Sequence, residues 1–189
     1  MTPNDPRPHV AERIDTARLS LRAPCAENGP ALHAAVHASL PELRAWMIWA
    51  ASPLDELGYI DHLRDAAERF QARTELRYLI FDRTTETLVG STGIHNLNWR
   101  VPKGEIGYWV DTRFAGRGLV TEAVIALTEY AQKDLRFRRV EIRCDAQNVR
   151  SRAVAQRAGY TLDATLINDD VAAHDSSQLR DTLIFSRVQ

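Results

Sequence analysis

The sequence carries no excess charge of either sign, since 24 lysines and arginines stand against 25 aspartates and glutamates, a net charge of −1. Without a basic field, a direct nucleic-acid partner is not expected. Cysteine is scarce, and Cys25 and Cys144 form neither metal-ligand spacing nor a disulfide framework. We therefore expect no metal site, and the two thiols suit a reducing compartment.

Long apolar runs are missing as well. No segment approaches the roughly 18 apolar residues of a membrane-spanning helix, and the first nine residues are too polar for a signal peptide. We therefore expect a cytoplasmic protein with no membrane partner. The length fits one domain, and no linker or internal repeat divides the chain. We expect residues 1–13 to be a flexible tail and residues 14–189 to be a single domain.

The most informative segment is residues 113–118, Arg-Phe-Ala-Gly-Arg-Gly, between a predicted strand at 105–110 and a predicted helix from 119. Gly116 and Gly118 permit a tight turn with uncovered N–H groups. A helix N-terminus follows, where free N–H groups and the dipole favour an anion. The segment therefore predicts a phosphate-binding loop. The two common nucleotide-loop patterns, GxxxxGK[ST] and GxGxxG with a distant acidic residue, are absent.

Apolar periodicity predicts a mixed α/β protein of the α+β class, with one mixed, largely antiparallel sheet. Asn148 is expected to cap a late helix that Gly159 ends, and Gly90 and Gly93 to mark a bulge or a close backbone approach. Residues 167–178 are expected to form a loop. Seven strands are expected at 18–22, 76–81, 88–94, 103–110, 139–144, 160–166 and 182–188, and about four helices at 27–47 with a break near Pro41, 53–73, from 119, and 148–158.

Several motifs together resemble the GNAT superfamily of acyl-CoA-dependent N-acyltransferases. The resemblance is strongest to the branch with the Rim-type N-terminal acetyltransferases of ribosomal proteins, the RimJ/RimL type. It covers nearly the whole chain and implies the GNAT fold, with a V-shaped splay between the fourth and fifth strands. The matching stretches are residues 16–22, residues 105–111, Arg113-x-x-Gly116-x-Gly118, Thr121-Glu-Ala123, Asn148-x-x-Ser151 and residues 157–160.

The resemblance implies acetyl-CoA as co-substrate, with no metal. The glycine loop and the first helical N–H groups would hold the pyrophosphate. The pantetheine arm would lie in the splay against the backbone of Trp109 and Val110, and Asn148 would hydrogen-bond it from the other side. Arg117 and Arg152 could neutralise phosphates. The predicted acetyl-CoA contacts are Trp109, Val110, Arg113, Phe114, Ala115, Gly116, Arg117, Gly118, Leu119, Val120, Thr121, Asn148 and Arg152.

Attack of an amine on a thioester needs a base for the amine and an acid for the leaving thiolate. Ser151 is the candidate acid, a role that the Rim-type resemblance gives it. Ala155 replaces the tyrosine that many GNAT enzymes use. The candidate bases are Asp170, with Asp169 if the register slips by one, and Glu105. The structural alternatives are a helix-start hydroxyl for Ser151, a solvated acidic loop for Asp170 and an ion pair for Glu105.

The acceptor is less defined. His95 could relay a proton through water, and Trp46, Trp49 and Trp99 could line the acceptor pocket. At pH 7, neutralising an α-amine costs about 1.4 kcal/mol, against about 4.6 for lysine, which favours an amine of low pKa. We expect direct transfer in a ternary complex, to a protein N-terminus or a small-molecule amine. Transfer of another short acyl group such as succinyl, an acyl-CoA sensor without turnover, and a monomer or a homodimer all stay open.

Overall fold

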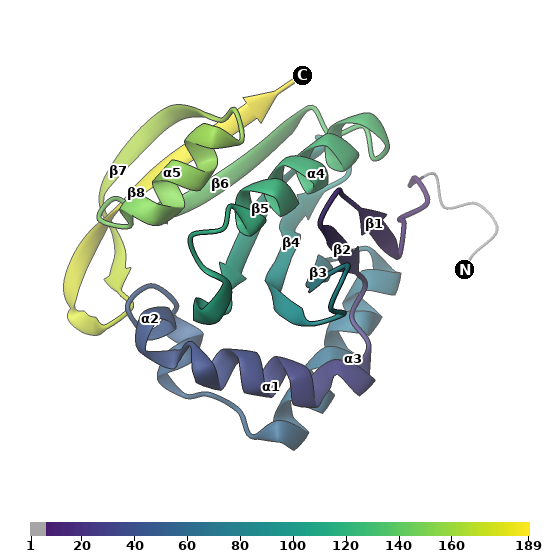
Figure 1. The fold of residues 1–189 in the computed structure, drawn as a ribbon. Coiled ribbons are helices and arrows are strands. Elements are labelled where there is room, and N and C mark those ends of the chain that lie inside the picture. Colours follow the sequence, from purple (N-terminus) through teal and green to yellow (C-terminus); the bar gives the residue numbers. More distant parts are fainter. Residues whose placement is uncertain (1–6) are drawn as a thin grey trace.

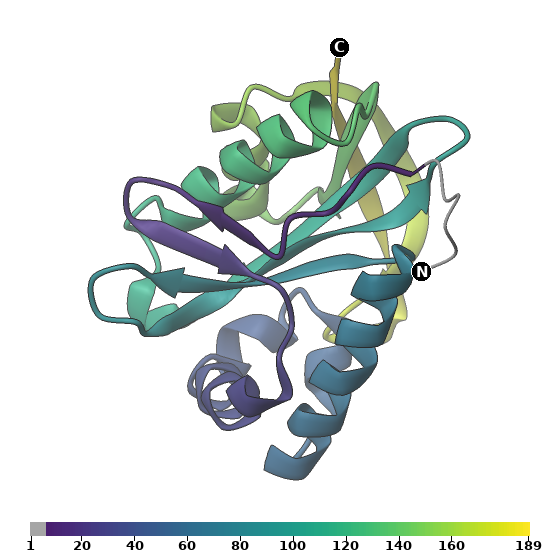
Figure 2. The same cartoon turned by 90° about the vertical axis from the view of Figure 1, so that its right-hand side faces the viewer.

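A computed structural model describes residues 7–189, which form one eight-stranded sheet with helices on both faces (Figures 1 and 2). The strand order is β1-β2-β3-β4-β5-β6-β8-β7. Every neighbouring pair is antiparallel except β5 and β6, which confirms the predicted mixed, largely antiparallel sheet. The strands are β1 Arg13–Asp15, β2 Leu19–Arg22, β3 Leu76–Asp82, β4 Leu88–Asn98, β5 Lys103–Val110, β6 Arg139–Asp145, β7 Thr161–Ala172 and β8 Asp175–Val188.

The helices agree with the predicted regions but are shorter. The first region divides at Ser39, close to the predicted break near Pro41, and Pro41 itself lies in the first turn of the second helix, where proline is tolerated. Asp55 caps the long helix by accepting the Gly58 N–H at 2.8 Å, so that helix starts after Pro53. The helices are α1 Gly29–Ala38, α2 Leu40–Arg44, α3 Glu56–Ala72, α4 Leu119–Lys133 and α5 Val149–Arg157, with 3-10 turns η1 Ala26–Asn28, η2 Ile48–Ala51 and η3 Thr112–Phe114.

Part of the predicted N-terminal tail belongs to the folded structure. Val10 is buried. The Ala11 N–H donates to the Tyr130 hydroxyl at 2.7 Å, and the Tyr78 hydroxyl donates to the Ala11 carbonyl at 2.7 Å. Residues 1–6 lie outside the described residues. The prediction of a flexible tail that reaches residue 13 is therefore wrong. The strand β1, which starts at Arg13, is also the strand that the prediction of seven strands missed.

The predicted loop at 167–178 is also wrong. The strands β7 and β8 continue through it as one long hairpin that turns at residues 173–174. Register shifts interrupt the pairing, and Asn168 has a positive φ of 53°. β7 is an edge strand whose side chains are mostly exposed, so it lacks the apolar alternation by which a strand is recognised in a sequence.

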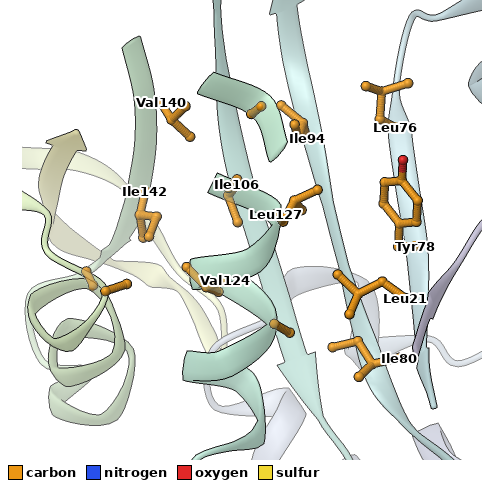
Figure 3. Close-up of a cluster of buried hydrophobic side chains, with 14 of the residues drawn as sticks. Leu21, Leu76, Tyr78, Ile80, Ile94, Ile106, Val124, Leu127, Val140 and Ile142 are labelled. Atoms are coloured by element: carbon orange, nitrogen blue, oxygen red, sulfur yellow. The ribbon is translucent and has the colours of Figure 1, made fainter. Parts of the chain in front are cut away.

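The sheet has a hydrophobic core on each face. Along β3, Tyr78 and Ile80 pack toward α4, whereas Leu79 and Phe81 pack toward α1 and α3. This alternation follows from the two-residue repeat of a strand. Figure 3 shows the α4-side core, where Val124 and Leu127 of α4 meet residues of the central strands. β5 contributes Ile106 to the α4-side core, and its Trp109 packs against the core on the other face.

The strands β5 and β6 separate soon after they start. They pair only at Lys103↔Arg139, Gly104↔Val140 and Glu105↔Glu141, and then diverge (Figure 1). This confirms the V-shaped splay. The predicted bulge is also present, because the β3–β4 register shifts opposite Gly90, and a Cβ there would collide with the Trp109 carbonyl. Because β5 and β6 diverge, the edge of β5 that faces β6 has no strand partner beyond Glu105.

Candidate active site

A cavity of about 800 Å³ passes through the splay. Its lining includes Glu105 and Trp109, which point to the α1–α3 face of β5, and Tyr108, which points to the α4–α5 face. Alternate residues of a strand face opposite sides, so a cavity lined by both sets joins the two faces of the sheet. Two different chemical groups can therefore meet in it from opposite sides.

The glycine loop ends at one side of this gap. Gly116 and Gly118 have φ values of +77° and +74°, a conformation that glycine adopts at no steric cost. A Cβ at Gly116 would meet nothing within 4 Å, so the backbone angle, not crowding, requires glycine. The first backbone bond of α4 runs from Glu122 N to Gly118 O at 3.1 Å. The preceding N–H groups lie at an open helix end and fit an anion.

The arginines of the loop are partly engaged elsewhere. Arg113 Nε donates to Asp111 Oδ1 at 2.9 Å, and Asp111 is fully buried. The guanidinium of Arg117 lies over the Phe114 ring, 5.2 Å from its centroid, and donates to the Arg113 carbonyl at 3.3 Å. These contacts brace the turn. The Arg113 side chain is nevertheless 59% exposed, so its predicted contact with the donor stays a prediction.

Ser151 lies where the gap meets α5. Asn148 Oδ1 accepts the Ser151 N–H at 2.9 Å, which confirms the predicted N-cap. Tyr108 Oη lies 3.0 Å from Ser151 Oγ and donates to the Ser151 carbonyl at 3.1 Å. Burial raises the pKa of Tyr108, and it also raises the pKa of the neighbouring Cys144 thiol. Both groups therefore keep their protons at neutral pH.

Glu105 and His95 form a pair on the opposite face. Their Oε1 and Nε2 atoms lie 3.2 Å apart. Asn96 Nδ2 donates to Glu105 Oε2 at 3.1 Å, and Arg143 lies 3.7 Å from the same oxygen. Burial works to raise the pKa of Glu105, but the hydrogen bond and charge of His95, with Asn96 and Arg143, hold it below its ordinary value. Glu105 is therefore ionised at neutral pH and orients the imidazole.

The position of the His95 ring depends on a glycine. A Cβ on Gly107 would lie 3.1 Å from His95 Cε1, so the missing side chain leaves room for the ring on the floor of the cavity. With Nε2–H directed at Glu105, the neutral ring presents Nδ1 as an acceptor. The sequence singled out His95 and Glu105 separately. Their pairing follows from the β4–β5 register, which places them directly opposite each other.

Asp170 does not join this arrangement. It lies in β7, where Oδ2 accepts from Arg180 Nη2 at 2.8 Å and Oδ1 accepts from the Val171 N–H at 2.8 Å. Among the described residues, Arg180 lines the cavity but Asp170 and the exposed Asp169 do not. The prediction of a carboxylate base at this point of the chain is thus disfavoured, because its oxygens are occupied by cross-strand and backbone donors.

The tryptophans separate into two groups. Trp46 and Trp49 line the cavity and are 39% and 45% exposed. The Trp49 ring lies 6.3 Å from that of Trp109, at an angle of 59°. Trp99 instead packs against Phe137 in the core, with ring centroids 5.2 Å apart. Trp99 is therefore not part of the cavity lining, whereas the segment around η2 contributes apolar side chains to it.

Two further observations bear on the class of protein. Across residues 7–189, none of the helices combines the length and hydrophobicity that a bilayer crossing requires. Within the same range, no three His, Cys, Asp or Glu side chains gather as a metal-binding group.

The predicted acetyl-CoA contact at Arg152 falls on an exposed side chain in the first turn of α5.

A phosphate-binding loop beside a splayed pair of parallel strands, with proton-carrying groups on both sides of the gap, defines a group-transfer site for a phosphorylated donor. The family model described as Acetyltransferase (GNAT) domain matches residues 18–161, and the chain belongs to this family.

Individual relatives agree with this assignment. YdaF of Bacillus subtilis (strain 168) is 40% identical over 74 residues, which cover 39% of this chain and 40% of YdaF. The match thus spans less than half the length of that relative. The structure of RimL, a ribosomal L7/L12 alpha-N-protein acetyltransferase in complex with coenzyme A, has a TM-score of 0.84 at 27% identity, over 94% of this chain and 98% of RimL. The predicted likeness to the Rim-type branch is confirmed.

A second solved structure shows the same fold. The microcin C7 self immunity acetyltransferase MccE, in complex with acetyl-CoA and AMP, has a TM-score of 0.84 at 23% identity. The match covers 92% of this chain and 94% of MccE. The same fold thus occurs in relatives solved with CoA and with acetyl-CoA.

Proposed function

We propose that this protein is an acetyl-CoA-dependent N-acetyltransferase that moves an acetyl group directly to a primary amine in a ternary complex. One observation carries the proposal: the cavity through the splay brings the Ser151 hydroxyl and the His95 imidazole to opposite sides of a single gap. A thioester in that gap would have a proton donor on one side and a proton acceptor on the other. Family membership and the CoA-bound relatives support acetyl-CoA as the donor.

The pantetheine arm is assigned to the free edge of β5. Beyond Glu105 this edge has no partner strand, so the backbone of Trp109 and Val110 can pair with an extended amide chain as it would with a strand. Asn148 lines the cavity from the α5 side. The backbone N–H groups of Gly116 and Gly118 and those of the first turn of α4 would bind the pyrophosphate.

The chemistry divides between the two faces. His95 Nδ1 accepts a proton from the amine, directly or through one water, while Glu105 stabilises the imidazolium that results. The amine nitrogen bonds to the thioester carbon, and the C–S bond breaks. Ser151 gives its proton to the departing thiolate, and the Tyr108 O–H, which otherwise donates to the Ser151 carbonyl, turns to the adjacent Ser151 Oγ as that oxygen loses its proton. His95 then releases the amine proton to solvent and Ser151 takes up a proton from solvent, so both residues regain their starting protonation and the net change is one proton moved from the amine to the thiol.

For the acceptor, we propose the N-terminal α-amine of a protein. RimL acts on such an amine, by its name. The apolar rim at the cavity mouth, formed by Trp46, Ile48, Trp49 and Leu54, is 39% to 55% exposed. It suits the side chains that follow an amino terminus. The tilted Trp49–Trp109 pair favours a second candidate, a small amine that carries a flat ring.

The test follows release of the CoA thiol from acetyl-CoA against a panel of N-terminal peptides and small amines. We expect at least one α-amine peptide to accelerate release. Succinyl-CoA in parallel reports the acyl preference. If no amine accelerates release although CoA binds by calorimetry, transfer is wrong and the protein is an acyl-CoA sensor. If a ring-bearing amine alone is accepted, the peptide acceptor is wrong.

A further inference from the structure

Two segments far apart in the sequence meet beside the glycine loop. Thr16 Oγ1 donates to Glu122 Oε1 at 2.6 Å, and the Arg18 N–H donates to the same oxygen at 3.0 Å. Arg18 Nε donates to Glu122 Oε2 at 2.7 Å. The turn between β1 and β2 therefore engages both oxygens of a carboxylate in the first turn of α4, and the amino-terminal side of that helix is tied to the sheet.

The carboxylate is charged. Burial works to raise the pKa of Glu122, but the hydrogen bonds from Thr16 and Arg18 and the Arg18 charge outweigh it, so the pKa lies below the ordinary glutamate value. Its side chain is 21% exposed, against 51% for Arg18. Glu122 thus places a negative charge next to a loop that is suited to anions, and the charge of Arg18 offsets it.

Arg18 also reaches the loop itself. Its Nη1 donates to the Arg117 carbonyl at 3.0 Å, and its Nη2 lies 3.8 Å from the position that a Cβ on Gly118 would take. The C=O and N–H of a trans peptide point in opposite directions. With the Arg117 carbonyl turned toward Arg18, the N–H of the same peptide, which belongs to Gly118, is therefore turned away from Arg18.

We propose that Arg18 is a positioning residue for the donor pyrophosphate. It acts through two groups: it fixes the orientation of the Gly118 N–H through the Arg117 carbonyl, and it neutralises the Glu122 carboxylate that would otherwise repel the phosphates. The inference rests on the proposed function in one respect, that the donor is an acyl-CoA. It explains why the 16–22 motif and the Thr121-Glu-Ala123 motif occur in one chain, since each supplies half of this contact.

Because the charges of Arg18 and Glu122 offset each other, the effects of removing them on CoA affinity should not add. Arg18→Met removes the guanidinium but leaves a bare carboxylate beside the anion site, so the Kd of CoA should rise about tenfold. In the double variant Arg18→Met/Glu122→Gln that carboxylate is gone, and the Kd should return to within about threefold of wild type. Arg18→Lys keeps the charge and should lose less affinity than Arg18→Met.

The experiment measures CoA affinity by calorimetry and turnover with two donors, acetyl-CoA and acetyl-pantetheine, which lacks the pyrophosphate. Arg18→Met should raise the KM for acetyl-CoA, leave kcat at saturation unchanged and leave turnover of acetyl-pantetheine at the wild-type rate. Arg13→Met is the matched control, because Arg13 lies on the adjacent strand and its Nε bonds Asp15 instead, at 2.9 Å.

Three outcomes overturn the inference. Arg18→Met could bind CoA as the wild type does. It could lose acetyl-pantetheine turnover in parallel with acetyl-CoA turnover, which indicates general damage to the fold. The double variant could bind CoA no better than Arg18→Met alone. A wild-type protein that binds no CoA overturns the proposed donor as well. Binding of CoA without amine acetylation overturns only the transfer.

Discussion

Tyr108 Oη lies 3.0 Å from Ser151 Oγ, although the two residues belong to elements on either side of the splay. The phenol comes from β5, and the serine comes from the first turn of α5, beyond β6. Their contact joins the two sides of the gap, and it orients the Ser151 hydroxyl beside a buried phenol that keeps its proton at neutral pH.

Ser151→Ala should lower kcat by about 100-fold, because the leaving thiolate loses its proton donor. The KM for acetyl-CoA should stay within about twofold, since the hydroxyl acts on the transition state rather than on the bound donor. Steady-state kinetics with the best amine checks both values. Ser176→Ala, on the exposed start of β8, is the control. A wild-type rate in Ser151→Ala would remove this serine as the acid.

Tyr108→Phe should lower kcat roughly three- to tenfold, because Ser151 loses the hydrogen bond that orients its hydroxyl. In the Ser151→Ala background the same change should have no further effect, since the two residues act as one unit. A double-mutant cycle on kcat measures this. The matched control is Tyr160→Phe, another buried tyrosine, whose hydroxyl pairs with Thr128 at 2.6 Å. Equal losses of kcat in the two tyrosine variants would indicate a packing effect.

The sequence was informative where structure is set locally. The tight turn at Gly116 and Gly118 and the Asn148 cap depend on residues a few positions apart, and both were predicted. The Tyr108–Ser151 contact was missed because it depends on how far β5 and β6 diverge. The prediction that Asp170 lies in a loop failed for a related reason. Its partner Arg180 lies opposite it on the neighbouring strand of a hairpin. Both faces of that hairpin carry polar, exposed side chains, so its sequence resembles that of a loop.

His95→Ala should lower kcat/KM for the amine by about 100-fold, because the general base is lost. Imidazole added to the assay should restore part of the rate, since the ring leaves a space over Gly107. His174→Ala, on the exposed hairpin turn, is the control and should need no rescue. Full activity of His95→Ala would assign the base elsewhere. A slow variant that imidazole does not rescue would indicate that the ring serves only to hold Glu105.

Asp170→Asn should keep kcat within about twofold of wild type, because both of its oxygens are held by Arg180 and the Val171 N–H and neither faces the cavity. Its thermal midpoint should fall by only a few degrees, as expected for a half-exposed ion pair. Parallel kinetics and thermal unfolding separate the two effects. A loss of about 100-fold in kcat with an unchanged midpoint would restore Asp170 as the base.

Glu105 should make stability depend on pH in a defined window. Its pKa in the folded protein lies below the ordinary value of 4.5, so the unfolded chain binds its proton first as the pH falls. The stabilisation is therefore complete above that ordinary value and is lost as the pH falls through the folded pKa. Wild type should be more stable than Glu105→Gln at pH 7, and this difference should shrink steadily below about pH 4.5.

Urea unfolding of both proteins across the acid range measures this difference in free energy. Glu86→Gln is the control, because Glu86 forms an ion pair with Arg22 but its side chain is 59% exposed, and exposed pairs contribute little. A difference between wild type and Glu105→Gln that stays constant from pH 7 down to pH 3 would show that the contacts of Glu105 do not depend on its charge. In that case the ionised carboxylate could not be what holds the His95 ring in its tautomer.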